Sequence, residues 1–129
     1  MASQISQGIK IDVEVFYQEE LSRVARNEYV FGYRITIENY NPFAIRVVQS
    51  HWHIVDSSGK WQEMVSEGII KGIKPYIESD KFLQYMGSCT IDSEIGKIQG
   101  EYIVENQFTK ETFKVIIPEF ILIIPAKLN

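Results

Sequence analysis

Short runs of alternating apolar and polar residues fill most of this chain, from residue 9 to residue 124. In the first run Ile9, Ile11 and Val13 alternate with Lys10 and Asp12. Successive side chains of a β-strand point to opposite faces, so a period of two predicts strands with one face in a core. The predicted strands cover residues 9–17, 29–37, 45–55, 61–65, 81–91, 95–104, 108–117 and 120–124. This pattern is typical of an all-β protein, an antiparallel β-sandwich of about seven to nine strands.

The segments between these runs are rich in turn residues. Asn and Pro at residues 39–42 favour a turn, and residues 66–75 form a glycine-containing connection. Pro118 is expected to end the strand before it, because proline cannot donate a hydrogen bond to a ladder. We expect one domain over residues 9–129 and a disordered or frayed N-terminus over residues 1–8.

Size and composition narrow the functional classes. The chain has 129 residues, 45% of them hydrophobic and 23% charged, which suits a globular domain with its own core. The net charge of -4 disfavours binding to duplex nucleic acid, since phosphate neutralisation dominates such affinity. The polar N-terminus is no signal peptide, and the longest apolar stretch falls short of the ~20 residues of a membrane helix. With Cys89 as the single cysteine, the sequence favours a reducing, cytoplasmic setting and no membrane association.

Two histidines flank a tryptophan in the predicted strand 45–55. The period of two places His51 and His53 on one face and Trp52 on the other, where Trp52 is expected to anchor the core. With a carboxylate from a neighbouring strand, the two imidazoles could ligate a divalent transition metal. The alternative is that both are ordinary solvent-facing histidines, because two ligands alone do not make a site.

The connection at residues 66–75 is a second candidate site. Gly68, Lys71, Gly72 and Lys74 offer backbone amides and cations that could hold a phosphate group. A dinucleotide fingerprint requires a following helix, which the pattern here does not predict, so a plain turn with bulges is the alternative.

We expect no catalytic residues and no cofactor. Nothing in the spacing of Cys89, the histidines or the scattered carboxylates marks a nucleophile with its base. Residues 115–124 are apolar on both faces, so this segment either is covered inside the fold or meets another protein.

Several stretches together resemble the ApaG family, also called CorD. They are residues 29–37 (YVFGYRITI), the His51–Trp52 pair followed by Ile54, Asp56 and Gly59, residues 85–88 (YMGS), 96–102 (GKIQGEY) and 113–120 (FKVIIPEF). The resemblance implies a fibronectin type III-like or immunoglobulin-like sandwich. It also implies bacterial members associated with cobalt resistance and magnesium efflux, and eukaryotic members that use the domain as a binding module.

The family's glycine loop, G-x-G-x-x-G, implies a pyrophosphate or nucleotide ligand. This chain departs from that loop, because Ser66 stands at the first glycine and Lys71 is an extra residue before Gly72. Ser50 also replaces an arginine that the family carries before the His-Trp pair.

These observations lead to three hypotheses. The first is a non-enzymatic interaction module whose partner is another protein, with a homo-oligomer left open. The second is a binder of pyrophosphate or a nucleotide at Gly68, Lys71, Gly72 and Lys74. The third is divalent metal binding at His51 and His53, while any effect on efflux would be indirect, because a domain without membrane spans moves no ion across a bilayer. The sequence favours the first.

Overall fold

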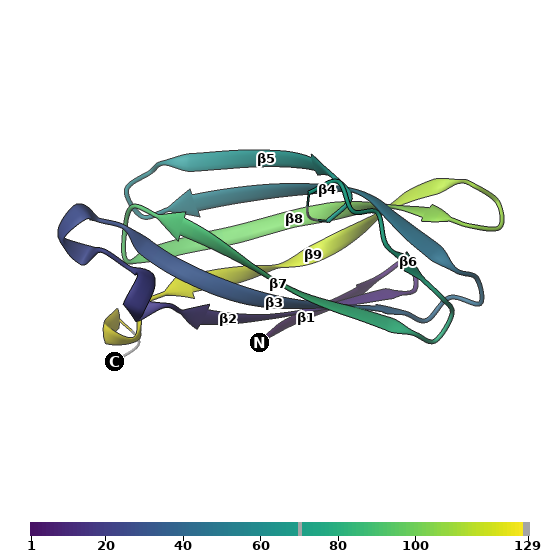
Figure 1. The fold of residues 1–129 in the computed structure, drawn as a ribbon, viewed down its shortest axis with the longest axis horizontal. Coiled ribbons are helices and arrows are strands. Elements are labelled where there is room, and N and C mark those ends of the chain that lie inside the picture. The colour runs from purple at the N-terminus through teal and green to yellow at the C-terminus, as the bar shows by residue number, and fades with distance from the viewer. Residues whose placement is uncertain (70, 128–129) are drawn as a thin grey trace.

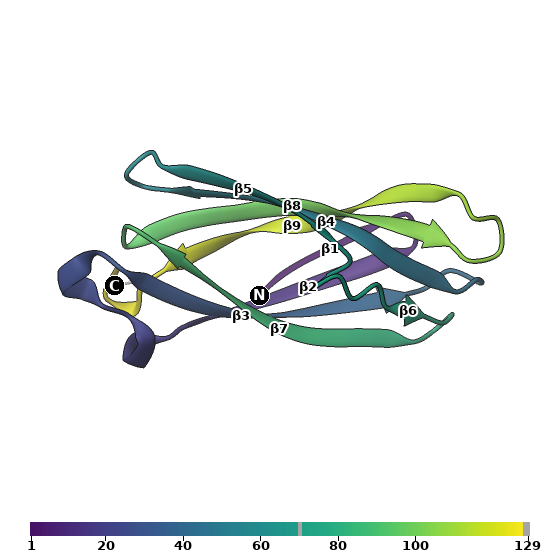
Figure 2. The ribbon, with the colours of Figure 1, turned by 45° about the horizontal axis from the view of Figure 1, so that its top comes forward.

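Two antiparallel sheets pack face to face in the computed structural model, which describes residues 1–69 and 71–127 (Figures 1 and 2). The first sheet has the order β1-β2-β3-β7, and the second has the order β5-β4-β8-β9 with the short β6 paired to β4. Their bounds are β1 Ala2–Ser6, β2 Ile9–Tyr17, β3 Tyr29–Asn39, β4 Ile45–Asp56, β5 Trp61–Glu67, β6 Tyr76–Ile77, β7 Phe82–Ile91, β8 Ile95–Asn106 and β9 Thr112–Ile123. Three single 3₁₀ turns, η1 Glu19–Leu21, η2 Val24–Arg26 and η3 Pro125–Lys127, complete the described elements. The predicted all-β sandwich is confirmed.

The alternation in the sequence becomes the core of the sandwich. Ile9, Ile11 and Val13 of β2 are buried. They face the apolar side chains of the second sheet, and the polar residues between them point outward. Trp52 is 7% exposed and makes edge-on contacts with the rings of Tyr102 and Phe120, so the predicted core anchor is confirmed.

The N-terminus is a strand, and the expectation of a frayed segment over residues 1–8 is wrong. Residues 2–6 pair with β2 in regular antiparallel register, from Ala2 opposite Val13 to Ser6 opposite Ile9. Most of the β1 side chains are exposed. The strand is therefore held mainly by its main-chain pairing, which leaves little trace in the pattern of side chains.

Pro118 lies inside β9, and the expectation that it ends the strand is wrong. The pairing of β8 with β9 shifts between Ile98 and Gly100, so that Pro118 and Glu119 both stand opposite Gln99. A β-bulge of this kind leaves one residue out of the ladder, and a proline without an N–H group fits there. The segment predicted as two strands, 108–117 and 120–124, is one strand that begins at Thr112.

One lateral side of the sandwich is closed and the other has free edges. On the closed side β9 lies against β1 and β2, and the amide of Ile116 donates a hydrogen bond to Ser6 Oγ at 2.9 Å. The inward side chains of the apolar segment at residues 115–124 are therefore covered within the fold, whereas Ile116 and Ile121 on its outer face stay 39% and 50% exposed. On the other side the two sheets end in β5 and β7.

Candidate functional site

The outer face of the second sheet carries a group of histidine and glutamate side chains that could bind a ligand or a metal ion. Because Trp52 points into the core, its neighbours His51 and His53 point outward, as predicted. Antiparallel pairing places Glu63 of β5 directly opposite His53 and Glu101 of β8 directly opposite His51. Three adjacent strands thus deliver two imidazoles and two carboxylates to one face.

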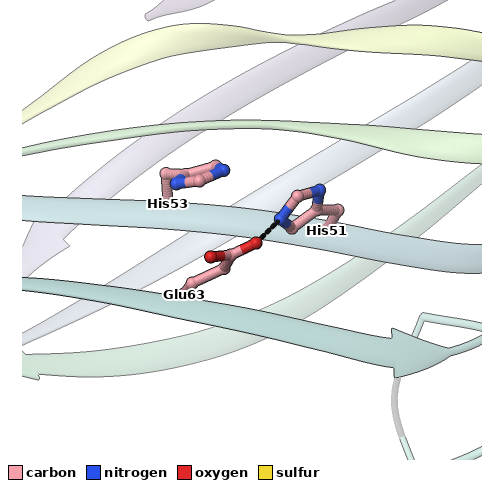
Figure 3. A group of neighbouring side chains, drawn as sticks. All are labelled: His51, His53 and Glu63. Carbon is pink, nitrogen blue, oxygen red and sulfur yellow. Dashed lines mark hydrogen bonds and ion pairs between the residues drawn. The ribbon is translucent and has the colours of Figure 1, made fainter.

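The distances within this group are short. His51 Nε2 lies 2.6 Å from Glu63 Oε1, and His51 Nδ1 lies 3.5 Å from Glu101 Oε1. The rings of His51 and His53 have centroids 4.6 Å apart (Figure 3). One ligand atom from each of His51, His53 and Glu63 can be chosen so that all three lie within 4.8 Å of one another. We call these three residues the His–His–Glu cluster.

The cluster borders a hollow on the side of β8 and β9. This hollow, of about 390 Å³, is lined by both histidines and by polar side chains from three strands, Gln4, Gln99 and Glu119. Lys114 Nζ lies 3.7 Å from Glu101 Oε2, which pairs this carboxylate with a cation on the side away from the cluster. The hollow leaves room for water or a small ligand beside the imidazoles.

Exposed apolar side chains frame the cluster. Trp61 and Val65 of β5 are 62% and 57% exposed, and Val55 of β4 lies opposite Trp61. On β8, Lys97 separates Val55 from the exposed Ile121 of β9. All seven residues of β5 are exposed, because the strand extends beyond the opposite sheet at the upper edge of the molecule in Figure 1.

The glycine–lysine loop is closed largely on its own backbone. Gly68 adopts a left-handed φ of 65°, its amide donates to Val48 O at 2.8 Å, and the amide of Ile69 donates to Ile73 O at 2.9 Å. Lys74 Nζ lies 3.8 Å from a Glu67 carboxylate oxygen. Two amides and one lysine that a phosphate would need are therefore already engaged.

The remaining residues of that loop are placed as follows. Lys71 and Gly72 are exposed, with φ values of 49° and 77°, and residue 70 lies outside the described residues. The phosphate site at Gly68, Lys71, Gly72 and Lys74 stays a prediction.

Cys89 lies apart from the histidines. It is on β7 opposite the buried Phe31 and packs against the core, whereas His51 and His53 are on the outer face of the other sheet. Burial raises the pKa of the Cys89 thiol to about 11. A protonated, core-facing thiol is a poor nucleophile, and neither histidine is placed to activate it.

Sequence reasoning anticipated the histidines but did not name their carboxylate partners. Spacing within β4 was enough to place His51 and His53 on one face. The positions of Glu63 and Glu101 beside the histidines depend on the register of β4 with two other strands, which no local pattern specifies.

No described helix is both long and apolar enough to cross a bilayer.

Comparison with known proteins places the chain in a family. Residues 19–106 match the ApaG domain. Protein ApaG of Sinorhizobium fredii is 35% identical over 126 residues, which cover 98% of this chain and 95% of that protein. The chain belongs to the ApaG family. The resemblance carried by the sequence motifs is thereby confirmed.

Solved structures agree with this assignment. A crystal structure from the Northeast Structural Genomics Consortium has a TM-score of 0.88 at 29% identity and covers 98% of this chain and 94% of its own. The putative ApaA protein from Bordetella pertussis has a TM-score of 0.86 at 28% identity and covers 91% of this chain and 94% of its own. Both solved structures therefore share the sandwich fold over most of this chain.

Proposed function

We propose that this ApaG domain is a non-enzymatic interaction module that binds an extended segment of a partner protein along the free edge of β5. The observation that carries the proposal is the state of this strand. β5 is seven residues long, every residue is exposed, and among the described strands it pairs with β4 alone. An unpaired strand edge presents a row of backbone donors and acceptors that an added strand can satisfy.

The side chains of β5 suit a binding edge better than a protected one. Natural edges are blunted by proline or by charged side chains, lysine above all; β5 contains neither proline nor lysine, and its charged residues are Glu63 and Glu67. It carries Trp61 and Met64, residue types enriched in protein interfaces, at 62% and 43% exposure. We further propose that the protein acts in the cytoplasm, the setting predicted from its single cysteine.

Charge favours a basic partner over an acidic one. The outer face of β5 reads Trp61, Glu63, Val65, Glu67, so apolar and acidic positions alternate. An antiparallel strand added at the edge would place every second side chain opposite these. Apolar residues alternating with Lys or Arg at every second position of the partner would therefore match them. The net charge of -4 adds a long-range attraction for such a segment.

A second copy of this chain fits the same edge less well. If two β5 strands pair antiparallel about Met64, Glu63 lies opposite Val65 and Trp61 lies opposite Glu67, so neither glutamate meets a basic side chain. Either neighbouring register places Glu63 opposite a glutamate of the other copy, which is unfavourable. The β5 edge therefore favours a different, basic segment over self-association.

Peptide titration followed by ¹⁵N–¹H NMR tests the proposal. The probes are three nonapeptides with threonine at every second position. At the other positions the first alternates valine and lysine, the second alternates valine and glutamate, and the third carries the valines and lysines of the first in two blocks. We expect shifts along β5 and β4 with the alternating valine–lysine peptide, and at least about tenfold weaker binding of the other two.

Two variants localise the binding. Trp61→Lys combined with Val65→Lys should abolish it, and Phe82→Lys on the β7 edge, where the side chain is 65% exposed, should leave it unchanged. Shifts centred on β7, equal binding of all three peptides, or no binding would refute the proposal. A concentration-dependent dimer through β5 in sedimentation experiments would do the same, in favour of self-association.

The other two functional hypotheses have different standing. The phosphate hypothesis has lost support, since Gly68, Ile69 and Lys74 are already engaged. The cobalt and magnesium association remains an implication of the family resemblance.

A further inference from the structure

The His–His–Glu cluster has a geometry that an interaction edge does not require. His51 and His53 are the only histidines in the chain, and the fold brings both to one point together with a carboxylate from the next strand. We propose that His51, His53 and Glu63 form a binding site for a divalent transition ion of the zinc class, with its remaining coordination positions open to water.

The spacing fits an ion after a small adjustment. Bonds of about 2.0–2.2 Å to nitrogen and oxygen place tetrahedral ligand atoms roughly 3.4 Å apart. His51 Nε2 and Glu63 Oε1 are 2.6 Å apart, so they must separate by less than about 1 Å, and the full set within 4.8 Å must contract. Glu63 is 42% exposed along its side chain, so it can rotate without disturbing the core.

Glu101 acts as a positioning residue. It faces His51 Nδ1 at 3.5 Å, while Nε2 faces Glu63. A carboxylate that accepts the Nδ1 proton leaves the Nε2 lone pair for the metal and fixes the orientation of the ring. Lys114, 3.7 Å from the other oxygen of Glu101, holds this carboxylate in place.

The donor set selects the class of ion. Two imidazoles and one carboxylate suit zinc, cobalt, nickel and copper, whereas magnesium demands six oxygen ligands in octahedral geometry. The hollow beside the histidines can hold the water ligands that three protein donors leave to be supplied.

Over residues 1–69 and 71–127, no second group of three His, Cys, Asp or Glu side chains is placed to hold such an ion. The thiol of Cys89 is half-buried, and burial raises its pKa to about 11, so it offers little thiolate near neutral pH. Metal binding by an untagged protein therefore reports on this cluster.

Untagged protein titrated with Zn²⁺ by calorimetry, and with Co²⁺ by visible absorption and NMR, tests the site. We expect one equivalent of either ion to bind, with both imidazole signals shifting together, and no response to Mg²⁺ at the same concentration. His51→Ala, His53→Ala and Glu63→Ala should each abolish or strongly weaken binding. Glu67→Gln, which changes an exposed carboxylate on the same strand and face as Glu63 but outside the cluster and the hollow, is the matched control and should leave the affinity unchanged.

The role of Glu101 has its own readout. Glu101→Gln should weaken binding by about 10- to 100-fold and alter the ¹⁵N shifts that report the His51 tautomer in the metal-free protein. Circular dichroism checks that each variant remains folded. Affinity unchanged by His51→Ala or His53→Ala, equal binding of Mg²⁺, or a shift of only one imidazole would overturn the site.

Discussion

The hydrogen bond between Tyr85 and Tyr102 is a sensitive point of the core. Tyr102 of β8 is fully buried, Tyr85 of β7 is half-buried, and their hydroxyls bond to each other across the two sheets. Burial raises the pKa of both tyrosines, so both are neutral phenols near neutral pH. The perturbation is removal of each hydroxyl by phenylalanine, singly and together.

The two single substitutions should differ in cost. Tyr85→Phe leaves the Tyr102 hydroxyl buried without its partner, which costs about 1–3 kcal/mol of unfolding free energy. Tyr102→Phe leaves the hydroxyl of Tyr85, a side chain that is half-buried and not fully buried, so we expect a smaller loss of about 0.5–1.5 kcal/mol. The double variant leaves no hydroxyl unsatisfied, and its cost should fall below the sum of the two by about 1 kcal/mol or more.

Urea unfolding followed by tryptophan fluorescence measures this cycle. Equal slopes of free energy against urea would show that all four proteins unfold from similar states to similar states. Strictly additive costs, or a Tyr102→Phe variant less stable than Tyr85→Phe, would refute the reasoning.

Three further predictions concern other buried or constrained positions. Asn39 is fully buried, and its side chain bonds two backbone carbonyls and one amide at 2.9–3.1 Å, so Asn39→Ala should lower the unfolding free energy by about 2–4 kcal/mol in urea. Gly68→Ala should cost at least about 2 kcal/mol in thermal or urea unfolding, because φ is +65° and the new Cβ would lie 1.9 Å from Ile73 O. Gly59→Ala, with φ +88° but open space around it, should cost less, and equal losses would contradict the steric argument. Burial raises the pKa of the Cys89 thiol to about 11. Its labelling by a thiolate-specific reagent at pH 8 should therefore be about 100-fold slower than that of an ordinary thiol, and the rate should rise about tenfold per pH unit up to pH 10. A rate independent of pH would show that access to the thiol, and not its ionisation, limits the reaction.

Strong alternation made the central strands predictable, and the errors fall where long-range pairing overrides local rules. Residues 9–17 match β2 at both ends, because each buried position there is apolar and each outward one except Phe16 is polar. The prediction at Pro118 was wrong because the effect of a proline on a strand depends on its pairing. Here Gln99 of β8 stands opposite both Pro118 and Glu119, so the bulge accommodates the proline. Residues 1–8 misled it because an edge strand can be held by main-chain bonds with few apolar side chains.

In the candidate site, too, the residues set by local spacing were predictable and those set by strand pairing were not. Period two is a property of one strand, so the common face of His51 and His53 followed from their spacing. Which carboxylates would join them depends on how β4 pairs with β5 and β8, and a shift of one residue in either pairing would have turned Glu63 or Glu101 to the opposite face.

The integration of β1 into the first sheet has a practical consequence for shortened forms of this protein. Removal of residues 1–8 would strip the partner from one side of β2 and withdraw Ser6 from the amide of Ile116. The nine-residue β2, with its three buried aliphatic side chains, would then become an unpaired edge strand. A truncated protein of this kind invites edge-to-edge aggregation, and its loss from solution would say nothing about the β5 surface.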